Sequence, residues 1–197
     1  MDVKETDHYF IIDFDSTFTK VEALDILCEI SLKDSIHRDA ALKRIQEVTD
    51  LGMLGELSFR ESLEERIKLL HAKREHLPEL IERLRSMVSE SFQRNKQFIS
   101  EYGDNIIIVS NGFKDFIIPI VIEYGIHPEN VYANDFIYDE NEFIVDFNKN
   151  NLLSSNNGKP KLIESLNLDG DIFVIGDGYN DYEIKAAGLA KEFYAFT

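Results

Sequence analysis

Cysteine is almost absent from this sequence, because Cys28 is the only one among its 197 residues. A single thiol cannot form an intrachain disulfide, and it cannot build a cysteine zinc site. Such cysteine usage is compatible with a reducing compartment, so we expect a cytoplasmic protein. Histidine is sparse as well, and the five histidines show no spacing typical of metal ligands.

Basic residues are too few to balance the acidic ones. The sequence has 21 Lys and Arg against 37 Asp and Glu, which gives a net charge of −16. This charge repels nucleic acid and anionic membrane surfaces, so we expect neither as a partner. An anionic ligand would therefore need positive charge supplied locally by a metal ion, a lysine or an arginine.

Long apolar runs are missing too. No run approaches the ~18 residues that a membrane-spanning helix needs, and residues 1–8 are polar and charged. We therefore expect neither a membrane anchor nor a targeting segment. What is present is a globular composition, 44% hydrophobic and 29% charged, in a length that allows one domain or a domain with a modest insertion.

Three short apolar runs with β-branched residues predict buried strands at 9–14, 106–110 and 172–177. The other expected elements are helices at 114–124, 160–167 and 181–187, a hairpin over 131–147 that turns at 139–142, and a last strand at 192–196. Strands that alternate with helices predict an α/β fold with a doubly wound parallel sheet, in which ligands bind beyond the carboxyl ends of the strands.

Between the first two strands the pattern changes to helices alone, expected at 21–32, 36–49, 59–71 and 78–90. This helical stretch is too long for an ordinary crossover connection. We therefore expect a helical-bundle cap over residues 20–90, inserted after the first strand of a core made of residues 1–19 and 91–197.

Polar residues close each predicted strand. Asp13 and Asp15 end the first, Ser110, Asn111 and Gly112 end the second, and residues 176–181 (GDGYND) end the third. Acidic residues are rare at the end of a buried strand unless they are paired, bound to metal or catalytic, although GDGYND alone would suit an ordinary turn. In a parallel sheet the three polar ends would meet at one edge.

These motifs resemble the four ordered motifs of the haloacid dehalogenase superfamily. They are DFDST at 13–17, SNG at 110–112, a lysine at the start of the helix before the third strand, and GDGYND at 176–181. In addition, residues 21–25 and 52–70 are similar to the helical cap of the phosphoserine phosphatase family. The resemblance implies a Rossmann-like core with that cap.

The resemblance implies a role for each motif residue. Asp13 would be the nucleophile on a phosphate ester, and Asp15 the general acid and then the general base. Mg²⁺ would be held by Asp13, the backbone carbonyl of Asp15 and Asp177. The remaining motif residues would orient metal-bound water (Asp181), hold the site or the substrate (Asn180), and donate hydrogen bonds to the phosphate (Ser110, Asn111 and Gly112). Similar proteins often have glycine where Asn111 stands.

For the motif lysine we choose Lys159, because Pro160 would take the first helical position and leave Lys159 at the mouth of the helix. Lys161 is the alternative. For either lysine, the ordinary expectation is a solvated surface position.

The cap carries residues suited to a phosphorylated amino acid. Ser58 and Glu61 predict a capping box that starts a helix, and Arg66 lies on or beside the apolar stripe of that helix. Arg66 could instead extend along the bundle and pair with Ser62 or a nearby glutamate, and Glu22 could be an ordinary first-turn acid. By resemblance, the substrate-binding residues would be Arg66 for the carboxylate, Glu22 for the ammonium, and Met53 and Phe59 as an apolar lid.

The resemblance thus implies a magnesium-dependent phosphatase that hydrolyses phosphoserine in serine biosynthesis and acts as a monomer or homodimer. Two alternatives stay open. One is a related phosphomonoesterase or phosphotransferase with another substrate or acceptor. The other is a catalytically silent relative that binds a ligand or partner.

Overall fold

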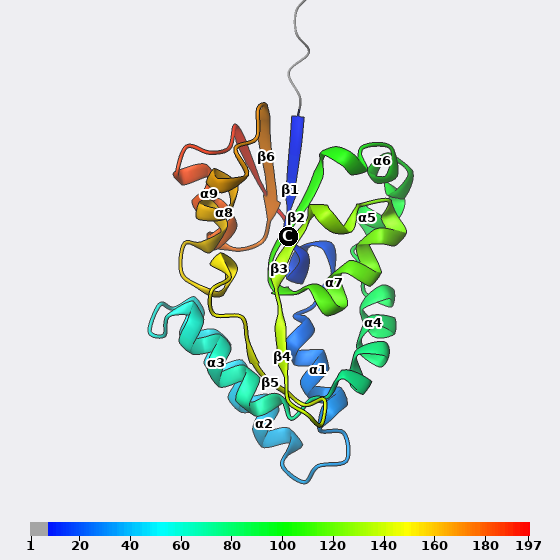
Figure 1. Cartoon of the computed structure of the whole chain (residues 1–197), viewed down its shortest axis with the longest axis vertical. Coiled ribbons are helices and arrows are strands. Elements are labelled where there is room, and N and C mark those ends of the chain that lie inside the picture. Colours follow the sequence, from blue (N-terminus) through cyan, green and yellow to red (C-terminus); the bar gives the residue numbers. More distant parts are fainter. Residues whose placement is uncertain (1–7) are drawn as a thin grey trace, which may run out of the picture.

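A five-stranded parallel sheet forms the centre of the protein in the computed structural model, which describes residues 8–197 apart from the side chain of Met53 (Figure 1). The order of the strands is β3-β2-β1-β6-β7. Their bounds are β1 His8–Ile12, β2 Ile106–Phe113, β3 Val131–Asn134, β6 Asp171–Gly176 and β7 Glu192–Ala195. The predicted doubly wound parallel sheet is confirmed. The part of the predicted core at residues 1–7 and the predicted lid side chain of Met53 lie outside the described residues.

The centre of the sheet is buried on both faces, which explains why its inner strands are continuous apolar runs, whereas the edge strand β7 is mostly exposed. Ile12 and Ile108 belong to one hydrophobic cluster, whereas their neighbours Ile11 and Ile107 belong to a second one on the opposite face. Helix α7 packs in the first cluster, and α8 and α9 pack in the second (Figure 1). The helices of the core are α5 Glu90–Arg94, α6 Lys96–Glu101, α7 Lys114–Val121, α8 Gly158–Leu166 and α9 Tyr179–Ala186.

Four helices between β1 and β2 extend beyond the carboxyl ends of the strands (Figure 1). They are α1 Ala23–Ser31, α2 Arg38–Met53, α3 Phe59–Leu70 and α4 Leu77–Ser86. The capping box predicted at the start of α3 is present, because Ser58 accepts a hydrogen bond from the backbone of Glu61 and Glu61 accepts one from the backbone of Ser58. The helix predicted at 78–90 is shorter than expected, since α4 ends at Ser86 and the next helix, α5, begins only at Glu90.

The hairpin predicted over residues 131–147 is wrong in its first half. Val131–Asn134 is β3, which pairs in parallel with β2 in the central sheet. Three of its four residues are buried, as a core strand requires. The antiparallel hairpin consists of β4 Phe136–Tyr138 and β5 Ile144–Phe147. Its turn packs on the linker between α3 and α4, where the Ile144 amide donates to the Ala72 carbonyl at 2.8 Å.

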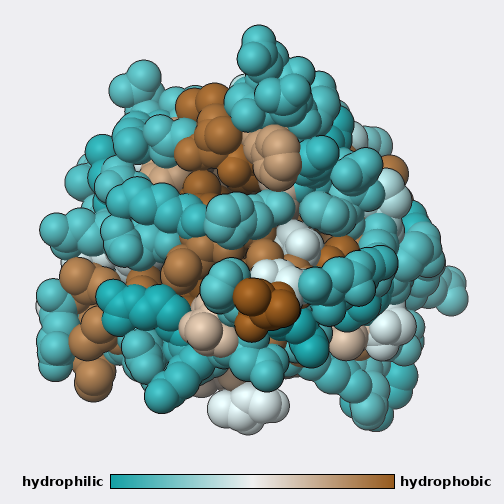
Figure 2. Space-filling view, turned by 90° about the horizontal axis from the view of Figure 1, so that it is seen from below, coloured by the Kyte–Doolittle hydropathy of each residue, from teal (hydrophilic) through white to brown (hydrophobic). Residues whose placement is uncertain are grey.

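The surface at the cap end is mainly hydrophilic, with apolar side chains scattered over it (Figure 2). Exposed apolar residues in the cap segments include Ile36 and Leu54. Isolated apolar side chains of this kind are ordinary on a protein surface and indicate no binding site. Among the described residues, none of the helices combines the length and the apolar character that crossing a membrane requires.

Candidate active site

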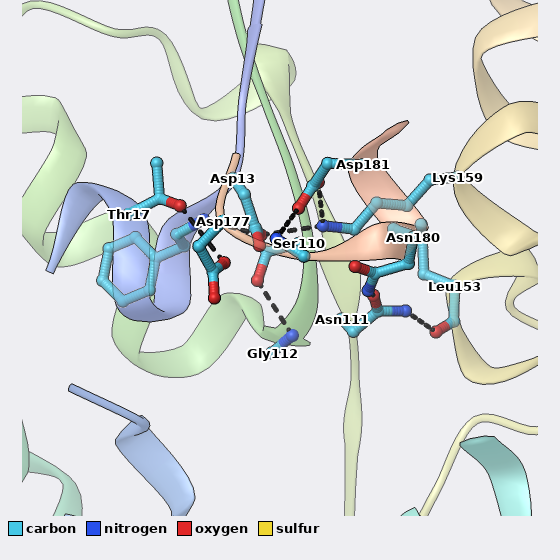
Figure 3. A network of polar contacts seen from close by, with 12 residues as sticks. Asp13, Thr17, Ser110, Asn111, Gly112, Leu153, Lys159, Asp177, Asn180 and Asp181 are labelled. Atoms are coloured by element: carbon cyan, nitrogen blue, oxygen red, sulfur yellow. Dashed lines mark hydrogen bonds and ion pairs between the residues drawn. The ribbon is translucent and has the colours of Figure 1, made fainter. Parts of the chain in front are cut away.

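The carboxyl ends of three neighbouring strands bring the motif residues together (Figure 3). Asp13 follows β1 directly, Ser110 lies in the last part of β2, and Asp177 follows β6. From β1 the chain crosses to β2 and β3 on one side, and it then returns to β6 and β7 on the other side of β1. Ligands bind at such a topological switch point in open α/β sheets. The predicted convergence of the three polar ends is confirmed.

Lys159 lies between two buried aspartates at the centre of the site (Figure 3). Its Nζ is 2.9 Å from Oδ1 of Asp13 and 2.7 Å from Oδ1 of Asp181. Burial by itself would lower the pKa of Lys159, but the two carboxylates raise it above its ordinary value. The helix begins at Gly158, so Lys159 lies in its first turn and not before it, and the alternative, Lys161, is exposed.

Asp13 is buried, and its pKa is raised to about 8 by burial and by the nearby Asp181, despite the opposing effect of Lys159. Its Oδ1 also accepts the Phe14 amide at 2.7 Å. Carboxylate oxygens of Asp13, Asp177 and Asp181 lie within 4.8 Å of one another, and Lys159 pairs with two of these three groups. Such a group of hard oxygen donors suits a divalent cation such as Mg²⁺.

Asp177 is the exposed member of this acidic cluster. Burial and Asp181 raise its pKa above the ordinary value. One of its carboxylate oxygens accepts the hydroxyl of Thr17 at 3.4 Å. Asp181, in contrast, is fully buried, pairs with Lys159 and accepts the Gly178 amide at 3.2 Å, so it fixes the turn that carries Asp177.

Asp15 lies between the start of α1 and the end of β2. Its Oδ1 accepts the Ala23 amide at 2.8 Å. Its Oδ2 would lie 2.8 Å from a Cβ atom at Gly112, so only glycine fits there without displacing the carboxylate. Burial and the charge of Glu22 raise the pKa of Asp15 well above its ordinary value, which favours a carboxyl group that holds a proton.

An irregularity in the pairing of β2 with β3 shapes the segment with Ser110, Asn111 and Gly112. The register shifts between Val109 and Phe113, as at a β-bulge beside an active site. The Gly112 amide, predicted to bind phosphate, donates to Oγ of buried Ser110 at 2.9 Å. Asn111 accepts a hydrogen bond from the Asn180 side chain at 2.8 Å.

Arg66 is buried in the cap, only 7% exposed. It does not extend to solvent, and Ser62 donates to the Val48 carbonyl at 3.1 Å, so the structure does not show the predicted alternative pairing with Ser62. Burial lowers the pKa of Arg66, and the negative charges of Glu22, Asp25 and Asp15 oppose this effect. Its buried Nε has no hydrogen-bond partner among the described residues, so the guanidinium keeps a donor that a carboxylate ligand could use.

Glu22 and Phe59 are the other described cap residues that we predicted to bind substrate, and both contact the core. Glu22 accepts the hydroxyl of Ser16 at 2.7 Å, which ties it to the loop that carries Asp15. Phe59 is partly buried against the main hydrophobic cluster, and its amide donates to Oδ1 of Asn156 at 2.8 Å. The start of α3 is therefore attached to the core beside α8.

Two residues near the site were not predicted from the sequence. Asp25 is near Arg66 and has a buried oxygen without a hydrogen-bond partner. Its position three residues after Glu22, on the same side of a helix, could have indicated it. Asn134 is fully buried at the end of β3. A polar residue closing an apolar strand could have indicated it too, had that strand been separated from the hairpin.

Asp25 gives a testable pH dependence of stability. Burial and Glu22 raise its pKa from 3.8 to about 6. Because folding raises the pKa of this carboxyl group, the folded state binds its proton more tightly than the unfolded state does. The stability gained from this proton is present below a pH of about 4 and is lost as the pH rises to about 6. Asp25→Asn should therefore raise the free energy of unfolding by about 1 kcal/mol at pH 7.5, after allowance for solvent screening, and leave it unchanged at pH 4. Thermal unfolding at both values of pH measures this difference, and equal effects at the two values would contradict it.

The comparisons with known proteins agree with this geometry. The sequence is 29% identical over 175 residues to a phosphoserine phosphatase from Drosophila melanogaster, which covers 87% of this chain and 62% of that protein. It is 26% identical over 188 residues to a chloroplastic phosphoserine phosphatase from Arabidopsis thaliana, which covers 94% of this chain and 61% of that protein. The chain spans about three-fifths of the length of these two relatives.

The fold has close counterparts among solved structures. A phosphoserine phosphohydrolase-like protein from Francisella tularensis superposes with a TM-score of 0.84 and 29% identity, over 96% of this chain and 87% of that one. A substrate-bound phosphoserine phosphatase, 24% identical, has the same fold with a TM-score of 0.75 over 98% of this chain and 87% of that one. The sequence matches the family of haloacid dehalogenase-like hydrolases over residues 10–184. With a family match over most of its length and the motif side chains gathered at one sheet edge, the chain belongs to the haloacid dehalogenase-like hydrolases.

Proposed function

We propose that this protein is a magnesium-dependent phosphoserine phosphatase, which hydrolyses O-phospho-L-serine to L-serine and phosphate. The observation that carries this proposal is that Arg66 is buried in the cap near the negative charges of Glu22 and Asp15, while the Ser16 hydroxyl ties Glu22 to the Asp15 loop at 2.7 Å. Groups for an amino acid thus lie next to groups for phosphate chemistry. The named relatives support the same substrate.

In the first half of the reaction, a carboxylate oxygen of Asp13 attacks the phosphorus atom, and the bond from phosphorus to the serine oxygen breaks. Asp15 gives its proton to the departing serine oxygen. The raised pKa of Asp15 favours the protonated form that this step requires. The product is serine together with an aspartyl phosphate on Asp13.

In the second half, Asp15 takes a proton from water while the water oxygen bonds to phosphorus. The bond from phosphorus to the Asp13 oxygen breaks, which releases phosphate and restores both aspartates. Lys159, 2.9 Å from Asp13, offsets the negative charge that accumulates during both halves. Ser110, beside Gly112, offers a hydroxyl to a phosphate oxygen.

Recognition of the amino-acid part would come from the cap. Arg66 would bind the carboxylate of the substrate, and Glu22 would bind its ammonium group. Glu22 is already held by Ser16 at 2.7 Å, so it needs little reorganisation. Phe59, and Met53 by its sequence position, would close the apolar side of this pocket.

The donor set also fits the cofactor expected from the sequence. We assign Mg²⁺ to Asp13, the backbone carbonyl of Asp15 and Asp177, because both carboxylate oxygens of Asp181 are already engaged, Oδ1 by Lys159 at 2.7 Å and Oδ2 by the Gly178 amide at 3.2 Å. When bound, the cation would offset repulsion between the carboxylates and the phosphate and stabilise charge on the phosphoryl oxygens.

The proposed organisation follows the sequence expectations. We assign residues 20–90 to the cap, and residues 8–19 and 91–197 of the predicted core to the core, with the hairpin β4–β5 packed against the cap linker. The buried, unpaired thiol of Cys28 suits the cytoplasm. A monomer or a homodimer would serve equally, because the proposed groups all come from one chain.

Arg66→Ala provides the test of the substrate. We expect it to raise KM for phosphoserine about 100-fold, because a charge-assisted contact to the substrate carboxylate is lost, and to leave KM for p-nitrophenyl phosphate unchanged. The measurement is phosphate release from both substrates with Mg²⁺, with and without acceptor alcohols. Arg44→Ala, which removes an exposed arginine paired with Glu47, is the matched control. Wild-type turnover of phosphoserine no faster than of the aryl phosphate would refute the proposed function.

A further inference from the structure

Three asparagine side chains connect the elements around the site, and Figure 3 shows two of them, Asn111 and Asn180. Nδ2 of Asn180 donates to Oδ1 of Asn111 at 2.8 Å, and Nδ2 of Asn111 donates to the Leu153 carbonyl at 2.7 Å. Nδ2 of Asn134 donates to the carbonyls of Asn111 at 2.8 Å and Leu153 at 3.3 Å. This asparagine relay (Asn134, Asn111 and Asn180) links β3, the irregular end of β2, the segment before α8, and the start of α9.

The backbone carbonyl at one end of the relay fixes the direction of every amide in it. The Leu153 carbonyl can only accept, so the side chain of Asn111 must present its nitrogen to it and its oxygen to Asn180. Asn180 must then present its nitrogen to Asn111. The Asn180 oxygen consequently points the other way, toward the side of the site where Ser110 lies (Figure 3).

The Asn180 oxygen fits against Gly178, in the turn before α9. It lies so close to Gly178 that a Cβ atom there would approach it to 2.4 Å. Glycine at this position therefore leaves room for the orientation in which the Asn180 nitrogen donates to Asn111 and the Asn180 oxygen faces the site. Phosphate oxygens are acceptors themselves, so the partner of this oxygen must be a donor, such as water or the substrate ammonium.

We propose that Asn111 is a positioning residue for the proposed phosphatase reaction, on which this inference rests: its side chain holds Asn180 with the amide oxygen toward the reacting groups. Buried Asn134 supports this arrangement, because it draws the Asn111 and Leu153 carbonyls together. A glycine at position 111 has no side chain and could not form this relay, so the arrangement depends on the residue that this chain carries there.

A double-mutant cycle tests the proposal. Asn111→Ala should lower kcat for phosphoserine at least about tenfold with KM changed less than about twofold, in the range typical of residues that orient catalytic groups. If Asn111 acts through Asn180, the double variant should be no slower than Asn180→Ala alone. Losses in kcat that multiply would overturn the proposal, as would an Asn111→Ala variant with the wild-type kcat. Asn111→Ser, which is too short to contact Asn180 and Leu153 together, replaces the alanine variant if that one does not fold.

The matched control is Asn130→Ala, which removes an asparagine that donates to the Gly103 and Asp104 carbonyls outside the site, and it should keep full activity. NMR gives a readout that needs no substrate: the side-chain amide signals of Asn180 should shift in Asn111→Ala, whereas those of Asn130 should not. Unmoved Asn180 signals would refute the relay whatever the activity. If phosphoserine is not hydrolysed, the proposed function fails by itself, and the cycle is measured with p-nitrophenyl phosphate.

Discussion

Asp13→Asn should lower phosphoserine turnover by at least about 10⁴-fold while the protein stays folded. The amide keeps the shape of the carboxylate and can still accept the Phe14 amide, but it is a far weaker nucleophile toward phosphorus. The wild type should also yield an acid-stable phosphorylated protein on rapid quenching, with the label on Asp13. The variant should yield none.

The stability of Asp13→Asn separates this chemical loss from unfolding. Burial raises the pKa of Asp13 to about 8, so its ionisation in the metal-free protein opposes folding as the pH rises from about 4 to 8. The variant without this carboxyl group should therefore unfold at the same temperature as the wild type or higher at pH 7.5. Asp104→Asn, a change at a residue with a highly exposed side chain, is the control. Activity within tenfold of the wild type would remove Asp13 as the nucleophile.

The sheet, and the position of the candidate site at the carboxyl ends of its strands, could be predicted because both depend on short sequence patterns. Each core strand that carries a motif is an apolar run closed by a polar group, and parallel pairing brings such ends together. The position of Lys159 followed from its place before Pro160 at the start of a helix. The structure places Lys159 within 3 Å of Asp13 and Asp181, although the helix begins at Gly158.

The features that the sequence did not predict depend on tertiary packing. Val131–Asn134 is a short, mostly apolar segment shortly before a turn, so it suits a hairpin strand as well as a core strand, and only its pairing with β2 distinguishes them. The asparagine relay joins residues up to 69 positions apart through a backbone carbonyl, and a backbone carbonyl leaves no trace in the sequence. Likewise, helical spacing placed Arg66 near the apolar stripe but could not show which acids surround it.

Lys159→Met should lower the free energy of unfolding by about 3–5 kcal/mol at pH 7.5, because it leaves buried Asp13 and Asp181 without their cationic partner. Methionine fills nearly the same volume, so the loss reflects charge and hydrogen bonding more than packing. With the lysine gone, the pKa of Asp13 should rise further above its ordinary value. Because Asp13 of the wild type ionises only at a pH of about 8, the penalty should grow as the pH rises from 7.5 to 9, where the variant still resists this ionisation.

Lys161→Met is a matched control, since Lys161 is an exposed lysine two residues along the same helix. It should change the free energy of unfolding by less than about 0.5 kcal/mol.

Adding Mg²⁺ distinguishes lost charge balance from lost packing as the cause of the instability of Lys159→Met. A cation that binds the folded acidic cluster stabilises it by mass action, and the variant with more uncompensated charge should gain the larger rise in unfolding temperature. Equal rises in Lys159→Met and the wild type, or a penalty that does not change between pH 7.5 and 9, would show that Lys159 contributes packing and not charge balance. A larger rise in the variant would instead show that the lysine and the divalent cation neutralise the same group of carboxylates.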